Sequence, residues 1–239
     1  MTNIFLGYST GVFYPSVNKI NSILHRLTDL QTNLIEVNVA TPSELSQITE
    51  DDIKIINKFK TKTIHAPFKD VRYDVSQRDL LRKLYELAKK IDATYILFHP
   101  DTIDDFGIVY DELGQLAAFE NMDARKNFGN KVEDLETIFS LCPKSGWVCD
   151  LNHMYSIDKS MQLSKDFHNH FRDRLVGYHI SGYGDESILH TCFYLTHETQ
   201  ILNGIENMTV PLIHEGGNPV DPNFLVNEFE YVSSYISNI

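Results

Sequence analysis

The sequence predicts a single (β/α)8 barrel, a TIM barrel, that spans residues 1–239 as one domain. Short apolar segments rich in β-branched and aromatic residues alternate with longer segments of helical spacing, which is typical of a parallel sheet. Eight such repeats divide the 239 residues into units of about 30, the length that a strand and its crossover helix need. No linker interrupts this alternation, so we expect one closed unit.

The elements follow one another in a regular order along the chain. The expected strands are residues 3–8, 33–39, 61–66, 94–99, 116–120, 146–150, 175–180 and 210–215. The expected helices are residues 17–30, 43–59, 77–91, 104–113, 132–141, 159–172, 191–202 and 223–236. In the third of these helices, Leu80, Leu84, Leu87 and Ile91 lie three or four residues apart, and therefore on one face. The segment 104–113 is short and acidic and carries the weakest helical pattern.

An open, doubly wound sheet is the alternative fold. Such a sheet would have a glycine-rich phosphate turn after its first strand. The turn here reads GYSTGVFYP and lacks the G-x-G-x-x-G pattern. The sequence therefore favours the barrel.

Composition and charge exclude several classes of protein. There are 21 Lys and Arg against 33 Asp and Glu, a net charge of −12, which argues against binding of polyanions by the whole surface. The 3 cysteines have no C-x-x-C spacing, so neither a disulfide framework nor a cysteine zinc site is indicated. No apolar run is long enough to span a bilayer and no secretory leader is visible, so we expect a cytoplasmic protein without a membrane partner.

Six consecutive strands each end in a histidine or a carboxylate. These residues are His65, His99, Glu120, Asp150, His179 and Glu215. In a barrel of this kind the carboxyl ends of the strands meet at one rim, where catalytic residues lie. Burying so many ionisable groups without a counter-charge would be costly, and a divalent cation removes that cost. Mixed nitrogen and oxygen ligands suit zinc, which we expect first, or Mn, Fe or Co, better than Ca or Mg.

Three further histidines lie close to these strand ends in the sequence. Asp150 and His153 form a D-x-x-H motif, from which we expect the histidine to reach the same cavity from a loop. His190 lies beyond strand seven and is a candidate for another ligand. His214 precedes Glu215 in its strand and should point to the opposite face, where it would pack against the barrel.

Cationic residues follow two of the strands. Lys69 and Arg72 come after the third strand, and Arg125 and Lys126 come after the fifth. We predict Lys69, Arg72 and Arg125 as substrate-binding residues, which would grip a small sugar phosphate or the end of a nucleic acid.

The rim residues resemble those of the xylose isomerase-like and endonuclease IV-like TIM barrels, which are divalent-metal enzymes. The resemblance spans nearly the whole chain and rests on short motifs. It assigns the shared metal set to Glu120 in AFENMD, Asp150 in CDLNH, His179 in GYHIS and Glu215 in IHEGG. The endonuclease branch adds histidines that match His65, His99 and His153 and imply two or three metals. Its Asp-x-His after strand seven is broken here, because Ile188 stands two residues before His190.

Two chemistries follow from this resemblance. The main prediction is hydrolysis of a phosphoester at a two- or three-metal site, with Glu120, Asp150 and Glu215 as catalytic residues and the histidines as further ligands. The alternative is a single-metal sugar or sugar-phosphate isomerase or epimerase, in which Glu120 and Glu215 act as an acid/base pair. A third possibility is a barrel that only binds its ligand, against which the intact ligand set speaks.

Overall fold

Eight parallel strands close into a barrel in this computed structural model, which describes residues 5–13, 20–30, 32–185, 188–217 and 220–237. The barrel strands are β1 (Leu6–Ser9), β2 (Leu34–Asn38), β3 (Thr61–His65), β4 (Ile96–Phe98), β5 (Ala117–Glu120), β6 (Gly146–Asp150), β7 (Leu175–Ile180) and β10 (Leu212–His214). Each strand pairs with the next along the chain, and β10 closes the ring against β1 through the pair Leu6 and Leu212. The predicted (β/α)8 barrel is confirmed.

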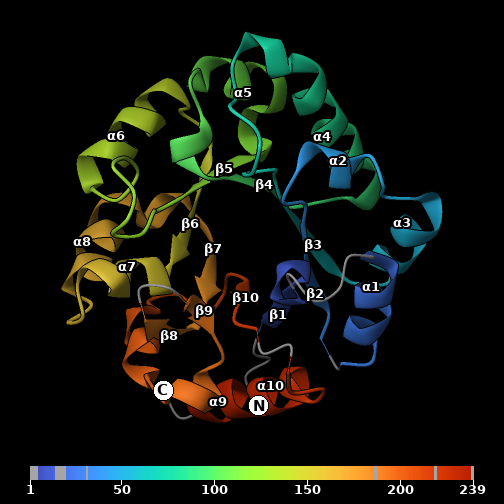
Figure 1. Cartoon of the computed structure of the whole chain (residues 1–239). Coiled ribbons are helices and arrows are strands. Elements are labelled where there is room, and N and C mark those ends of the chain that lie inside the picture. The colour runs from blue at the N-terminus through green and yellow to red at the C-terminus, as the bar shows by residue number, and fades with distance from the viewer. Residues whose placement is uncertain (1–4, 14–19, 31, 186–187, 218–219, 238–239) are drawn as a thin grey trace.

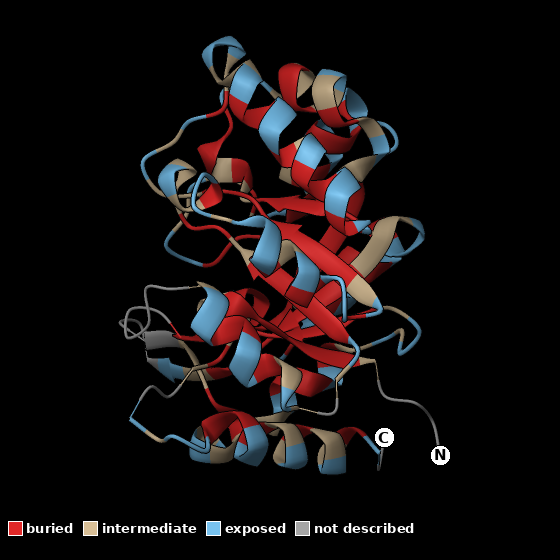
Figure 2. Cartoon of the chain, turned by 90° about the vertical axis from the view of Figure 1, so that its right-hand side faces the viewer, coloured by how far each residue is buried: buried red, intermediate tan, exposed pale blue. Residues whose placement is uncertain are grey.

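Helices form a ring around the outside of the strands (Figure 1). They are α1 (Ile20–Thr28), α2 (Pro42–Leu45), α3 (Glu50–Ile56), α4 (Arg78–Ile91), α5 (Phe106–Leu113), α6 (Val132–Leu141), α7 (Leu151–Ile157), α8 (Gln162–Phe171), α9 (Phe193–Thr196) and α10 (Phe224–Ile236). Figure 2 shows that the helices are buried on the side that faces the strands and exposed on the other. None of the described helices combines the length and the apolar character that crossing a membrane requires.

Most expected elements lie where the sequence placed them. The weak segment 104–113 does contain a helix, α5, whose N-cap Asp105 accepts a hydrogen bond from the Ile108 backbone N–H. The expected starts of the first strand and first helix fall on residues 3–4 and 17–19, which lie outside the described residues.

The expected helix 43–59 is instead two helices. α2 ends at Leu45, and α3 begins after Thr49, whose hydroxyl accepts a hydrogen bond from the Asp52 backbone N–H. The Asp52 carboxylate accepts one from the Thr49 backbone N–H in return. This reciprocal capping box starts a new helix, and therefore interrupts the predicted one.

The chain between β6 and β10 holds more structure than the sequence predicted. Helix α7 directly follows β6, so the D-x-x-H motif spans a helix start rather than a loop. After β7, a two-stranded hairpin forms from β8 (Gly182–Asp185) and β9 (Ile188–Thr191). The expected helix 191–202 becomes the short α9 and a 3-10 turn, η6 (Thr199–Gly204).

Further 3-10 turns link the elements. They are η1 (Thr10–Phe13), η2 (Val75–Gln77), η3 (Pro100–Thr102), η4 (Gly114–Leu116) and η5 (Arg172–Arg174).

The apolar core has two parts. The larger part lies between the strands and the helices and includes Leu24, Leu84, Phe119 and Trp147. The smaller part consists of Tyr95, Leu97, Ala118 and Val148, with Val176 packed against it. Each of these residues lies an even number of positions before the rim residue of its strand β4, β5 or β6, so its side chain points to the same face of the sheet. They therefore fill the lumen below the rim.

Candidate metal centre

Four of the predicted site residues meet at the carboxyl end of the barrel. Glu120 ends β5, Asp150 ends β6, His179 lies near the end of β7, and Glu215 follows β10 directly. One possible ligand atom of each lies within 4.8 Å of the others. The structure thus brings together the four residues that the resemblance assigned to a shared metal.

The imidazole of His179 lies between carboxylates. Its Nδ1 is 3.2 Å from Glu120 Oε1 and 3.2 Å from Glu215 Oε2. Asp150 Oδ1 accepts a hydrogen bond of 2.6 Å from the His153 backbone N–H, as the N-cap of α7. Asp150 Oδ2 has no hydrogen-bond partner among the described residues. A buried carboxylate oxygen without a partner is costly, which indicates that something absent from the chain completes this group.

Negative charge is in excess at this buried point. Burial raises the pKa of Asp150 well above its ordinary value, and the nearby Glu120 and Glu215 carboxylates add to the rise. Burial opposes charge on His179, but Glu215 and other carboxylates raise its pKa well above the usual range. Burial likewise opposes charge on Glu215, yet His179 lowers its pKa to about 2. The raised pKa values of Asp150 and His179 thus favour protonation at a point where a cation would balance the same charge.

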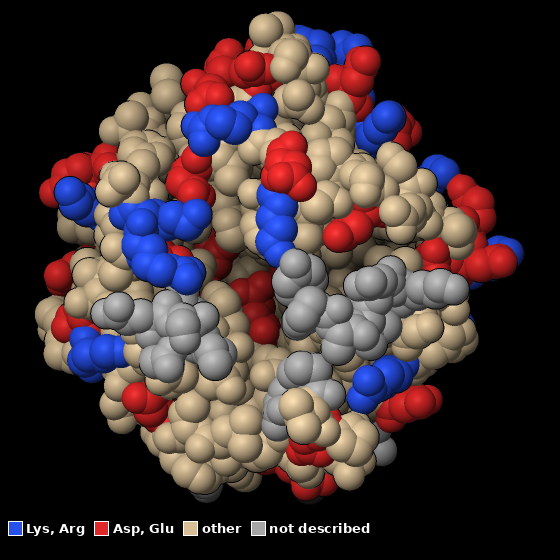
Figure 3. Space-filling model, viewed as in Figure 1, with Lys and Arg blue, Asp and Glu red and all other residues tan. Residues whose placement is uncertain are grey.

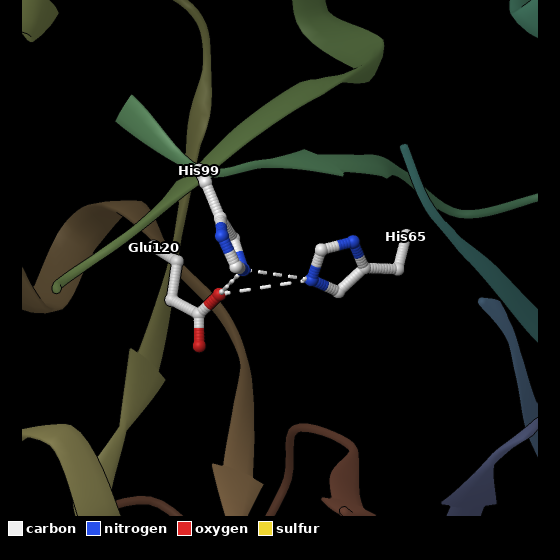
Figure 4. A group of neighbouring side chains, drawn as sticks. All are labelled: His65, His99 and Glu120. Carbon is white, nitrogen blue, oxygen red and sulfur yellow. Dashed lines mark hydrogen bonds and ion pairs between the residues drawn. The ribbon is translucent and has the colours of Figure 1, made fainter. Parts of the chain in front are cut away.

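A second group consists of His65, His99 and Glu120, which Figure 4 shows. It shares Glu120 with the first group. His65 Nε2 is 3.0 Å from His99 Nε2, and His99 Nε2 is 3.2 Å from Glu120 Oε2. The Nδ1 of His65 lies 3.0 Å from the Ala66 carbonyl oxygen, to which it donates. Its Nε2 consequently carries a lone pair directed at the group. Burial and the neighbouring His99 lower the pKa of His65, which keeps the imidazole neutral.

A third group joins Asp150 to two histidines. The rings of His153 and His190 meet edge to face with centroids 5.2 Å apart, and each residue offers a nitrogen to the group with Asp150. His153 Nδ1 lies 2.9 Å from the Asn121 carbonyl oxygen, to which it donates. Burial opposes charge on His153, but the Asp150, Glu120 and Asp123 carboxylates raise its pKa. Burial lowers the pKa of His190 to about 4. The side chains of residues 185–189, which include Asp185 and the motif-breaking Ile188, lie outside the described part of the chain.

A divalent cation fits this donor set. Carboxylate oxygens and neutral imidazole nitrogens are the ligands that zinc, manganese, iron and cobalt bind. The group around Glu120, Asp150, His179 and Glu215 supplies both kinds, and a cation would relieve both its excess charge and the unpartnered Asp150 oxygen.

His214 points away from the metal centre. Its Nε2 lies 2.5 Å from Glu228 Oε1 on α10, and both side chains are almost fully buried. Glu228 also accepts hydrogen bonds from the backbone N–H groups of Phe193 and Tyr194. The structure therefore places His214 between barrel and helix, on the face that strand alternation predicted.

A cavity of about 790 Å³ opens above the metal centre. Figure 3 shows a hollow near the middle of this face with acidic side chains on its floor and Lys or Arg side chains along part of its rim. Lys69, Arg125 and Lys126 line the cavity together with His65, His99, His153, His190 and Glu215. Arg125 pairs with Asp123, and Lys126 with Asp101.

Arg72 does not line this cavity. It pairs with Asp104 and contributes to a smaller neighbouring hollow of about 370 Å³, which Arg125 and Lys126 also line. Of the three predicted substrate-binding residues, Lys69 and Arg125 are therefore at the cavity, and Arg72 stands beside it.

Sequence reasoning missed two buried polar residues at the site. Glu36 on β2 lies 3.1 Å from His179 Nε2, and Asn121 holds the Asp150 backbone through its side chain. Glu36 had one signal, because it is a charged residue in the middle of an apolar strand, LIEVN. Asn121 had none beyond its place next to Glu120.

Sequence comparisons find a distant relative of this chain. No family model matches the chain. An uncharacterized protein of Methanocaldococcus jannaschii is 22% identical, over 78% of this chain and 81% of that one. The similarity is too low to assign the chain to a family.

Solved structures resemble the whole chain. A D-tagatose 3-epimerase-like protein has a TM-score of 0.73 at 15% identity, with 98% of this chain and 97% of that one covered. A 3-keto-D-glucoside 4-epimerase from E. coli has a TM-score of 0.64 at 16% identity, covering 97% and 99%. A D-psicose 3-epimerase has a TM-score of 0.63 at 13% identity, covering 97% and 98%. The chain thus shares the barrel fold of these three proteins over nearly its whole length.

Proposed function

We propose that this protein is a divalent-metal-dependent enzyme that isomerises or epimerises a sugar or a sugar phosphate. The observation that carries the proposal is the group formed by Glu120, Asp150, His179 and Glu215 at the floor of a large cavity. The structural neighbours named above, two of them sugar epimerases and one epimerase-like, support this reaction over the phosphoester hydrolysis that was the main prediction.

The four residues would hold the cation, and zinc, manganese, iron and cobalt all remain candidates. When bound, the ion supplies electrophilic polarisation of a carbonyl and a neighbouring hydroxyl of the sugar. His179 has no exposed surface, and Asp150 caps α7 by accepting a hydrogen bond from the His153 backbone N–H, so both would act as ligands only. Glu120 and Glu215 each lie 3.2 Å from His179 Nδ1 and are the candidates for proton transfer.

Proton transfer by these two glutamates follows from their charge. Their lowered pKa values keep both carboxylates ionised, despite the opposing effect of burial. One carboxylate accepts the proton from the carbon next to the substrate carbonyl. In an isomerisation the same glutamate would return this proton to the adjacent carbon, while the proton of the neighbouring hydroxyl passes to the former carbonyl oxygen. In an epimerisation the other glutamate would first take a proton from solvent and give it to the opposite face of the carbon, and the first glutamate would release its proton to solvent.

The cavity suits a small polar substrate. Its volume of about 790 Å³ lies within the range of roughly 300–1,000 Å³ usual for small-ligand sites. Lys69 and Arg125 on its wall favour a substrate with an anionic group, such as a sugar phosphate. Arg72 is only a neighbour of these two residues, because it lines the smaller hollow and not the cavity.

Hydrogen exchange at carbon tests this proposal directly. The metal-free protein, reloaded separately with Zn²⁺, Mn²⁺, Fe²⁺ or Co²⁺, is incubated in deuterated water with a panel of ketoses and ketose phosphates. We expect metal-dependent deuterium incorporation next to the carbonyl and a new stereoisomer or aldose by NMR. A chain that binds metal but exchanges no carbon-bound hydrogen in any sugar of the panel contradicts the isomerase or epimerase assignment.

Phosphoester hydrolysis is a second candidate, because the group of His65, His99 and Glu120 offers a place for another ion. Two metals about 3.5–4 Å apart are typical of phosphoesterases. If this candidate holds, the His65→Ala/His99→Ala double variant loses about one bound ion per chain and its cleavage of abasic DNA. If the variant retains the wild-type metal count, the multi-metal hydrolase is excluded. A barrel that only binds its ligand gains no support from the complete donor set.

A further inference from the structure

Glu36 is a buried carboxylate that takes no part in the metal-ligand groups. It lies in the middle of β2, with no measurable exposure to solvent. Its Oε2 accepts a hydrogen bond of 3.1 Å from the Thr63 hydroxyl on the neighbouring strand β3. The same oxygen is 3.1 Å from His179 Nε2. Because β10 and β1 separate β7 from β2 around the barrel, this last contact crosses the lumen.

The two nitrogens of His179 face different groups. Nδ1 faces Glu120 and Glu215 at the metal centre, whereas Nε2 faces Glu36. A neutral imidazole carries its hydrogen on one nitrogen and a lone pair on the other. If Nε2–H donates to Glu36, Nδ1 presents its lone pair to the centre. A carboxylate behind a histidine ligand fixes this tautomer, orients the ring and raises its basicity.

We infer that Glu36 is a positioning residue for the metal centre, which holds His179 with its Nδ1 lone pair directed at the cation. The inference rests on the metal site of the proposed function. It assigns to Glu36 a role in metal affinity and geometry, without contact to the metal or the substrate.

A second buried pair of glutamate and histidine gives a contrast within the same molecule. Glu228 accepts two backbone N–H hydrogen bonds besides its contact with His214, so it ties α9 and α10 to the barrel. Glu36 accepts only from side chains that line the lumen, and its Oε1 has no hydrogen-bond partner among the described residues. Glu36 thus does not hold the backbone of another element in place as Glu228 does, and its burial is best explained by its contact with His179.

The experiment compares Glu36→Gln with the matched control Glu228→Gln, since each removes one buried charge facing a histidine. Co²⁺ affinity of the metal-free full chain is measured by calorimetry, and the visible absorption of the Co²⁺-loaded chain reports the ligand geometry. Circular dichroism and a thermal melt check that each variant is folded. We expect Glu36→Gln to bind Co²⁺ about 10- to 100-fold more weakly, with altered absorption bands. Glu228→Gln should melt earlier but keep wild-type Co²⁺ affinity and spectrum.

The outcomes separate this inference from the proposed function. If the wild-type chain binds no Co²⁺, both the proposed function and the role of Glu36 are overturned. If the wild type binds Co²⁺, and Glu36→Gln binds it equally tightly with an unchanged spectrum, only the role of Glu36 is overturned. If Glu36→Gln does not fold, Glu36→Asp replaces it, because it keeps the charge but withdraws it from Nε2. We then expect a smaller loss of affinity, and unchanged affinity and spectrum contradict the inference.

Discussion

At the scale of the residue, strand alternation decides the role of each histidine. His214 and Glu215 are consecutive, yet the histidine faces α10 and the glutamate faces the metal centre. This difference could be predicted from the period of a strand alone. Glu36 could not be identified in this way, because its partner His179 is 143 residues away in the sequence. Only the closed barrel brings these two side chains together.

A prediction about two histidines follows from this alternation. His214→Ala leaves the buried Glu228 charge without its partner and should lower the free energy of unfolding by about 3 kcal/mol, with metal content unchanged. His179→Ala removes a ligand and should abolish metal binding. Urea unfolding and elemental analysis of the same preparations measure both quantities. Equal metal loss in the two variants would show that the register of β10 is wrong.

At the scale of the element, local capping explains where the sequence prediction was wrong. The apolar spacing in 43–59 fits one helix, but the capping box of Thr49 and Asp52 begins a second one. Asp150 likewise caps α7 and so turns the expected loop after β6 into a helix. The hairpin of β8 and β9 carries only four residues per strand, too few to show a period. Periodicity predicts long elements well, and short capped ones poorly.

Asp52 gives a pH-dependent prediction for α3. Despite its burial, hydrogen bonds from Thr49 and Asn21 lower the pKa of Asp52 below that of the unfolded chain, about 3.9. Its stabilisation is therefore complete above that value and is lost as the pH falls through the folded-state pKa. Asp52→Asn should cost about 1 kcal/mol of unfolding free energy at pH 7 and less at pH 3, by urea unfolding.

The control for this prediction is Asp51→Asn. Asp51 is exposed and pairs with Lys54 on the same helix, so its replacement should change the unfolding free energy by less than about 0.5 kcal/mol. The same loss for Asp52→Asn at both pH values would contradict the capping explanation.

At the scale of the whole molecule, the barrel lumen is divided into an apolar lower part and a polar upper part. Tyr95, Leu97, Ala118 and Val148 fill the lower part, and the ionisable residues of the rim lie above them. The sequence predicted this architecture and the rim residues, because six strand ends carry the same kinds of side chain. It did not separate isomerase from hydrolase, since the two chemistries share the four central ligands and differ in substrate and metal count.

Close packing at the bottom of the lumen gives a prediction. A Cβ added to Gly177 on β7 would lie 2.6 Å from the Tyr95 hydroxyl oxygen, so Gly177→Ala should cost about 1–3 kcal/mol of unfolding free energy. Tyr95→Phe removes that oxygen, which has no hydrogen-bond partner among the described residues. The double variant should therefore recover most of the loss in a denaturation series. No recovery would mean that the cost arises elsewhere.

The number of metal ions per chain is the most direct test of the account, because every functional statement depends on a cation at the rim. Elemental analysis of wild type after equilibration with Zn²⁺, Mn²⁺, Fe²⁺ or Co²⁺ should find at least one tightly bound ion per chain. Glu120→Ala should lose it, since Glu120 belongs both to the central group and to the group with His65 and His99. A wild type that retains none of these ions, or a Glu120→Ala variant with undiminished metal, would contradict the account.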